Sequence, residues 1–223
     1  MPTQKSRRIA HYYTDKELRE IADSLESAVA LPVNVEIEVD HRVFDLSEVE
    51  KILRDSKNIF LQKCGCRTLH GNCDSPLETC LAVNVDSYPI GGPDRGEARR
   101  ITVEEALDVL RRSHEAGLVH MAYVMKGDEK PFLICSCCTC CCHTLGGLIR
   151  HGIHTQVLKS KLIAEDDDQK CISCGKCVER CVFGARNMDY GKKKYDETRC
   201  FGCGLCVSTC PKGALRLVDR EKP

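Results

Sequence analysis

The sequence predicts an α+β fold, with a mixed α/β N-terminal domain over residues 1–165 and a smaller cysteine-rich domain over residues 166–223. Two observations predict this division. Helical and strand-like apolar patterns alternate through the first part of the chain, whereas the last part carries one cysteine motif twice. The acidic stretch EDDDQK (165–170) lies between the two parts, and we expect a solvated linker there.

Three helices are predicted from capping boxes, in which a Ser or Thr side chain and a Glu three residues later bind free backbone amides. The boxes begin at Thr14, Ser47 and Thr102, and helically spaced apolar residues follow each one. The first helix is expected to carry Leu25 on its apolar face, and Gly117 is expected to end the third.

Strands are predicted where apolar residues alternate or form short runs. VNVEIEV (33–39) alternates and suits a strand with one buried face, while 118–125 and 131–135 are short apolar runs that suit buried strands. The stretch 87–98 is rich in Gly and Pro, and we expect a loop.

Composition argues against several classes of function. Lys+Arg and Asp+Glu both number 33, and tryptophan is absent, so neither a charge excess nor an aromatic platform indicates a nucleic acid partner. The N-terminus lacks the apolar segment of a secretory signal, and no apolar run approaches the ~20 residues of a membrane span. We therefore expect a cytoplasmic protein with no nucleic acid partner and no membrane span.

The 18 cysteines indicate metal binding. They fall into three groups, with four in 64–80, six in 135–142 and eight in 171–210. In a reducing cytoplasm, thiols clustered in this way favour metal ligation over disulfides.

The most specific motif is C-x₂-C-x₂-C-x₃-C, which occurs twice at an offset of 29 residues. In such pairs, three cysteines of each run bind one 4Fe-4S cluster and the fourth binds the other. Zinc fits less well, because zinc sites combine C-x₂-C pairs rather than crossed runs of four. The first cluster is thus assigned to Cys171, Cys174, Cys177 and Cys210, and the second to Cys181, Cys200, Cys203 and Cys206.

Residues 166–218 closely resemble the bacterial-type dicluster ferredoxins through these two motifs. Pro211 follows Cys210 as in that family, whereas Val182 follows Cys181. Proline is not a ligand, so this departure leaves the assignment intact. The resemblance implies a ferredoxin-like domain that relays electrons through two 4Fe-4S clusters.

The ten upstream cysteines are expected to hold at least one further iron–sulfur cluster, with zinc and free or redox-active thiols as alternatives. Because Cys64 and Cys135 follow apolar segments, we expect both groups at the ends of strands. Adjacent cysteines are expected to serve different irons or different clusters. The ten residues are Cys64, Cys66, Cys73, Cys80, Cys135, Cys137, Cys138, Cys140, Cys141 and Cys142.

For the other polar side chains near these motifs we expect simpler roles. His70 and His143 are alternative ligands, because histidine can replace cysteine on iron. Arg67 is expected at the surface, and Lys192–Lys194 in a solvated hairpin turn. Structural roles are expected for His114 and His120.

Residues 60–218 as a whole resemble a group of cysteine-rich iron–sulfur proteins of anaerobes, on the basis of QKCGCR, CDSPLETCL, EEALDVLRRSHEAGLVH and ICSCCTCCC. This resemblance implies iron–sulfur binding and electron transfer without a defined substrate.

The leading hypothesis is an electron-transfer component of an oxidoreductase system rather than a stand-alone enzyme. Its partner would be a redox protein such as a flavin or metal oxidoreductase, since the chain has no nucleotide-binding glycine motif of its own. The alternatives are a redox enzyme with a substrate-binding cluster at residues 64–80 and 135–142, and a redox-sensing or metal-binding regulator. The spacing of these cysteines does not match the CCG-type pattern of heterodisulfide-reductase-like subunits.

Overall fold

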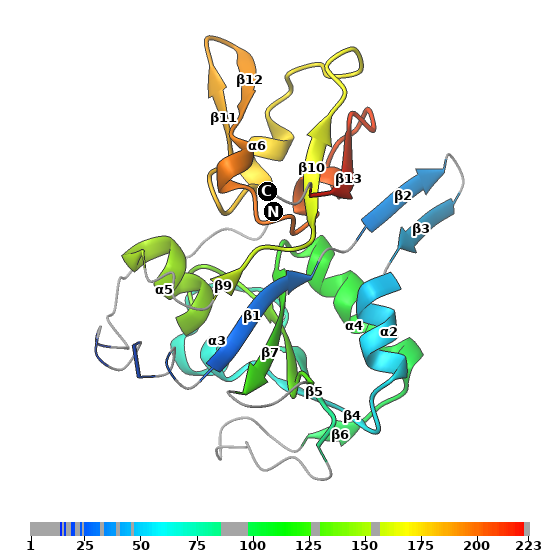
Figure 1. The fold of residues 1–223 in the computed structure, drawn as a ribbon, viewed down its shortest axis with the longest axis vertical. Helices are drawn as coiled ribbons and strands as arrows, with labels where there is room; N and C mark the ends of the chain where they lie inside the picture. Colours follow the sequence, from blue (N-terminus) through cyan, green and yellow to red (C-terminus); the bar gives the residue numbers. More distant parts are fainter. Residues whose placement is uncertain are drawn as a thin grey trace.

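A seven-stranded sheet forms the centre of the N-terminal part, and a small cysteine-rich unit is stacked against one end of it (Figure 1). The computed structural model describes residues 25–31, 34–38, 41–45, 47–85, 98–125, 130–152 and 157–220, together with the isolated positions 14, 16, 19, 20 and 23. None of the helices in these ranges has the length and apolar character that a bilayer crossing requires.

The strand order of the sheet is β6-β4-β5-β8-β7-β1-β9. Its strands are β1 (Leu25–Leu31), β4 (Ile59–Lys63), β5 (Glu78–Val83), β6 (Arg99–Arg100), β7 (Val119–Met125), β8 (Leu133–Cys137) and β9 (Val157–Leu158). Neighbours are antiparallel, except that β9 runs parallel to β1. A separate antiparallel hairpin consists of β2 (Asn34–Glu38) and β3 (His41–Asp45).

Of the helices in residues 47–152, those that accompany the sheet in the described ranges are α2 (Ser47–Arg54), α3 (Gly65–His70), α4 (Val103–Glu115) and α5 (His143–His151). The predicted capping box of α4 is present, since the Glu105 amide donates to Thr102 Oγ1 at 3.1 Å and the Thr102 amide donates to Glu105 Oε2 at 2.9 Å. This helix ends at Ala116, and Gly117 follows with a φ of 84°.

The two faces of the sheet pack against different partners because strand side chains alternate in direction. On one face, Leu81 and Ile134 pack with Leu53 of α2 and Leu110 of α4. On the other face, Met121 packs with residues of α5 and of the C-terminal unit. Figure 1 shows α5 on one side of the sheet and α2 with α4 on the other.

The C-terminal unit consists of two short antiparallel strand pairs and three short helices. Strand β10 (Leu162–Asp166) pairs with β13 (Leu215–Asp219), and β11 (Arg186–Asp189) pairs with β12 (Lys192–Tyr195). The helices are α6 (Lys176–Arg180), the 3₁₀ helix η1 (Glu197–Arg199) and α7 (Leu205–Ser208). The helices and antiparallel sheets confirm a mixed α+β fold.

Hydrogen bonds and a shared apolar cluster join the two parts of the molecule. Arg180 Nη2 donates to the carbonyl oxygen of His114 at 2.8 Å, and His114 Nε2 lies 2.8 Å from Ser208 Oγ. The rings of Phe183 and Phe201 stack at 4.3 Å within the apolar cluster that also contains Met121. The cysteine-rich unit is therefore held by specific contacts to α4 and to the sheet.

Several local predictions need correction. Lys16, Arg19, Glu20 and Asp23 are helical, but Leu25 begins strand β1 rather than lying on a helix face. The predicted loop 87–98 lies outside the described residues, except for Ala98.

The acidic stretch is not a free linker, because Glu165 and Asp166 belong to β10. Lys192–Lys194 lie in β12 rather than in a turn, and the Lys193 side chain is only 7% exposed. It forms ion pairs with Asp166 and Asp168.

Candidate metal centres

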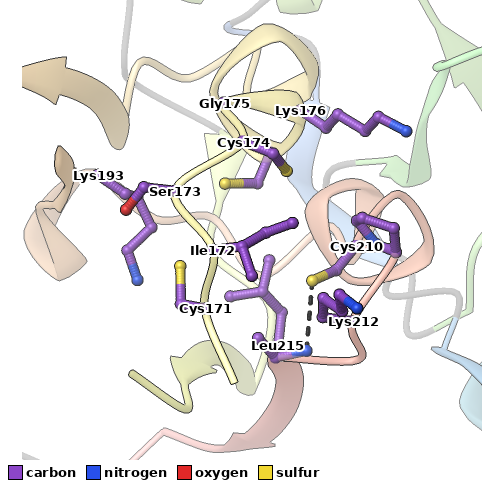
Figure 2. A pocket seen from close by; sticks show the side chains of 13 residues that line it. Cys171, Ile172, Ser173, Cys174, Gly175, Lys176, Lys193, Cys210, Lys212 and Leu215 are labelled. Atoms are coloured by element: carbon purple, nitrogen blue, oxygen red, sulfur yellow. Dashed lines mark hydrogen bonds between the residues drawn. The ribbon is translucent and has the colours of Figure 1, made fainter. Parts of the chain in front are cut away.

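The structure brings together the four cysteines that the sequence assigns to the first cluster. They line one pocket between the loop before α6 and the end of α7 (Figure 2). Ile172 and Leu215 give this cavity an apolar wall, and the Ala214 amide donates to Cys210 Sγ at 3.3 Å. The cysteines are Cys171, Cys174, Cys177 and Cys210.

The second predicted set lines a matching pocket. Phe183 and Phe201 form part of its wall, and the set consists of Cys181, Cys200, Cys203 and Cys206. Each cavity thus takes three cysteines from one run and one from the other. This is the crossed arrangement that two adjacent cubanes require.

Positive backbone φ angles shape these loops. Gly175 and Gly204 precede α6 and α7 with φ angles of 78° and 75°. At Gly202, with φ of 74°, a Cβ atom would lie only 2.0 Å from the carbonyl oxygen of Leu162. Its repeat counterpart Ser173 adopts φ of 49°, a conformation that costs a non-glycine residue free energy.

A buried cation lies beside both cavities. The Arg186 side chain is 1% exposed, forms a bidentate ion pair with Asp166 at 2.7 and 3.0 Å, and stacks on Tyr195 at 4.2 Å. Its positive charge interacts electrostatically with the thiols of Cys206 and Cys177, which belong to different cavities. Burial alone would raise the pKa of Asp166, but Arg186 and Lys193 hold it below its usual value.

Burial makes these sites suited to a metal rather than to free thiolates. It raises the pKa of Cys203, and it raises that of Cys206 to about 11 although Arg186 acts in the opposite direction, so both thiols stay protonated at neutral pH when no metal is bound. A bound metal cation reverses this preference, because a coordinating thiol is deprotonated.

The ten upstream cysteines separate into two neighbouring groups. We call the first the four-thiol site, which consists of Cys73, Cys138, Cys140 and Cys141. We call the second the six-thiol ring, which consists of Cys64, Cys66, Cys80, Cys135, Cys137 and Cys142.

The four-thiol site is formed by the loop after α3 and the turn between β8 and α5. All four sulfur atoms lie within 4.8 Å of one another. Cys73 and Cys138 are 3.8 Å apart, as are Cys140 and Cys141. The Asn72 amide group donates to the carbonyl oxygen of Cys140 at 2.9 Å and so ties the two loops together.

Successive members of the six-thiol ring interact electrostatically and shift one another's pKa. The order around it is Cys64, Cys66, Cys142, Cys137, Cys135, Cys80 and again Cys64. Its closest measured pair is Cys80 and Cys135, whose sulfur atoms are 3.7 Å apart on directly opposed positions of β5 and β8. The ring therefore depends on the register of the sheet.

The sheet and two helix starts position the ring. Cys64 and Cys142 precede the first residues of α3 and α5, and the Leu145 amide donates to Cys142 Sγ at 3.4 Å. The prediction that these cysteines lie at strand ends is only partly right. Cys64 does lie directly after the end of β4, but Cys80 and Cys135 lie within strands.

Arg67 is buried between the two groups, contrary to the surface position predicted for it. It is 2% exposed, and its guanidinium donates to the carbonyl oxygens of Pro76 at 3.0 Å and Ser136 at 2.9 Å and to Thr79 Oγ1. Its Nη1 also lies 3.9 Å from Cys138 Sγ. A buried guanidinium next to many thiols offsets the negative charge that metal-bound thiolates carry.

The histidines differ in their relation to these groups. His143 Nδ1 lies 3.4 Å from Cys66 Sγ, beside the six-thiol ring. His70 is buried at the end of α3 and is not part of the four-thiol site.

The buried pair His114 and His120 stack with ring centroids 5.9 Å apart. His120 Nδ1 lies 2.9 Å from Ser136 Oγ. Burial lowers the pKa of His114 to about 4, helped by the charge of Arg180, and lowers that of His120 to about 3.

The six-thiol ring and the second C-terminal cavity share one apolar cluster. Cys137 and Cys142 pack in it with Phe183 and Leu205, and Cys181 and Cys203 border it. Sequence reasoning missed this neighbourhood, because it follows from the pairing of β7 with β8 and from the docking of the C-terminal unit on that face.

Comparison with known proteins identifies the C-terminal part. Residues 166–220 match the family model described as a 4Fe-4S dicluster domain. No match was found among curated proteins. The ferredoxin-like resemblance of the C-terminal segment is thereby confirmed, and with it 4Fe-4S binding by a dicluster domain that follows a cysteine-rich α+β region.

Proposed function

We propose that the protein relays electrons between a redox partner and a metal centre in its N-terminal part, through two 4Fe-4S clusters in the C-terminal domain. Residues 1–165 and 166–223 would be the two domains, with β10 reaching across their boundary. The first cluster would be held by Cys171, Cys174, Cys177 and Cys210, and the second by Cys181, Cys200, Cys203 and Cys206. When bound, such clusters supply one-electron couples.

The six-thiol ring would hold the further iron–sulfur cluster. It supplies more than the four thiols that a cubane needs, and Cys80, Cys137 and Cys142 in it are buried. The shared apolar cluster is the observation that carries the proposal, because Cys137 and Cys142 belong to the same buried cluster as Phe183 and Leu205, which line the second C-terminal cavity.

In this relay the number of electrons received equals the number passed on, and no covalent bond of the chain changes. One electron taken from a reduced partner protein reduces one site, and one electron given to an oxidised acceptor returns that site to its first state. Arg186 acts on both C-terminal cavities, and its positive charge stabilises the reduced, more negative form of each site. The partner would be a flavin or metal oxidoreductase.

Iron and sulfide analysis of anaerobically purified protein, followed by an EPR-monitored reductive titration, tests this proposal. We expect about twelve irons per chain, with about eight from the C-terminal pair. Cys137→Ser should lower the count by about four and leave the C-terminal signals in place. A count of about eight in the wild-type protein would remove the further cluster, and the absence of reversible reduction would reject electron transfer.

A second candidate is an enzyme that binds its substrate at the six-thiol ring. The surplus of thiols over the four that a cubane uses favours this candidate, because a cluster in the ring need not have a fixed ligand set. Addition of an alkyl thiol as a probe should then change the EPR signal that Cys137→Ser abolishes. An unchanged signal would reject substrate binding at the ring and leave electron transfer as the proposed function.

A further inference from the structure

The four-thiol site has the dimensions of a site for a single metal ion. In tetrahedral zinc sites each Zn–S bond is about 2.3 Å, which places the sulfur atoms roughly 3.8 Å from one another. The two measured separations in this site, Cys73–Cys138 and Cys140–Cys141, are both 3.8 Å. The other pairs lie within the same 4.8 Å limit.

A cubane needs more room than this group provides. Each of its four thiolates binds a different iron, and the irons and sulfides between them hold the thiolates farther apart than the ligands of one ion. The same molecule shows this contrast directly. Among the described residues, neither the C-terminal cysteine sets nor the six-thiol ring meets the 4.8 Å limit, although Cys80 and Cys135 of the ring are 3.7 Å apart.

The separations also argue against disulfides. A disulfide brings two sulfur atoms to about 2.05 Å, and all four cysteines here are free. The adjacent residues Cys140 and Cys141 both belong to this group, with their sulfur atoms 3.8 Å apart.

The surroundings fit a charged thiolate site. Four thiolates and one divalent ion leave a net negative charge, and the buried Arg67 guanidinium lies 3.9 Å from Cys138 Sγ to offset part of it. Asn72 fixes the backbone at Cys140. Cys73 and Cys140 are only half-buried, so an ion can enter from solvent, while Cys141 is buried.

We infer that Cys73, Cys138, Cys140 and Cys141 bind a single tetrahedral zinc ion that stabilises the loops beside the six-thiol ring. The site is structural and closed, since all four positions are filled by protein thiolates. It stands apart from the proposed electron relay, whose clusters lie in the ring and in the C-terminal domain.

The test combines metal analysis with X-ray absorption at the zinc edge, on full-length protein purified anaerobically. We expect about one zinc per chain, coordinated by about four sulfur atoms at about 2.3 Å. Cys73→Ser should abolish this zinc and leave the iron content unchanged, and Cys73→His should retain the zinc, because histidine is also a zinc ligand.

The matched control is Cys66→Ser in the neighbouring ring, which should leave the zinc in place. The absorption spectrum of the wild-type protein supplies the answer even if a variant fails to fold. Zinc bound by nitrogen or oxygen atoms, zinc that persists in Cys73→Ser, or a loss of about four irons in that variant would each overturn the inference. A low iron count with intact zinc would count against the proposed relay and not against this site.

Discussion

The C-terminal cavities and the four-thiol site are both lined by four cysteines, but they are built in opposite ways. The C-terminal cavities come from two copies of a short motif, and positive-φ residues turn the loops around a wide space. The four-thiol site joins Cys73 to a turn 65 residues later, closes tightly, and lies beside a buried arginine. Residue type alone thus does not determine the size of a metal site, because the backbone that carries the thiols sets their spacing.

The largest expected effect concerns the buried charge of the N-terminal sites. Arg67→Met leaves two backbone carbonyls without a buried donor and removes the charge beside Cys138, so we expect a loss of about 3–5 kcal/mol in the free energy of unfolding. Zinc content should fall while C-terminal iron remains. Urea unfolding with metal analysis measures both.

Arg99→Met is the matched control for this charge. The Arg99 side chain is 55% exposed and pairs with Glu105, so its removal should cost less than about 1 kcal/mol. Equal effects of the two substitutions would mean that burial does not distinguish these arginines.

The next effect concerns the backbone of the C-terminal domain. Gly202→Ala places a methyl group against the Leu162 carbonyl, so β10 and the Cys200–Cys203 loop must separate, at an expected cost of about 2–4 kcal/mol. Iron should fall while zinc stays. Gly213→Ala has a similar φ of 56° but no neighbouring atom within 4 Å, and should cost only about 1 kcal/mol. Similar losses in both variants would show that strain, not the contact, determines the effect.

A third effect concerns the junction between the two regions. His114 has a folded-state pKa of about 4, so between this value and about 6.5 the unfolded chain binds a proton that the folded chain does not. Stability is therefore lost as the pH falls through that window, by up to about 1.4 kcal/mol per pH unit from His114, and His120 with its pKa of about 3 adds to this loss.

His114→Gln should reduce the slope of unfolding free energy against pH in this window, and the part that remains comes from His120. The exposed His151 provides the control substitution, His151→Gln, which should retain the wild-type slope. A wild-type slope in His114→Gln would argue against a neutral buried His114.

The smallest effect compares the two repeats. Ser173→Gly removes the strain of a positive φ at a non-glycine residue, as glycine does at the counterpart Gly202. We expect the free energy of unfolding to rise by at most about 1 kcal/mol. Thermal unfolding of the anaerobic protein measures it. A loss of stability would show that the Ser173 side chain contributes more than its backbone strain costs.

The sequence predicts the C-terminal domain better than the N-terminal sites, for a physical reason. Spacing within a short loop restricts where Cys171, Cys174 and Cys177 can lie, so the motif contains most of the geometry. The N-terminal groups depend on long-range pairing. Cys80 meets Cys135 because β5 lies beside β8, and no local pattern encodes that register.

Secondary structure is likewise predictable only where the signal is local. The capping box of α4 and the apolar run of β7 are local signals, and both predictions are confirmed. Leu25–Leu31 contains no clear alternation, yet it forms β1 because β7 offers it a partner. Arg67 is buried because its donors meet carbonyl oxygens from distant segments, which the sequence around it does not indicate.

The crossed cavities also impose an order on biosynthesis. A ribosome releases all ten upstream cysteines before the first C-terminal one, so a nascent chain can complete both N-terminal groups first. The cavity that begins with Cys171 receives its fourth cysteine only at Cys210, after the cavity of Cys181, Cys200, Cys203 and Cys206 already has all of its own. The first cavity whose cysteines are synthesised is thus the last whose set of four is complete in the growing chain.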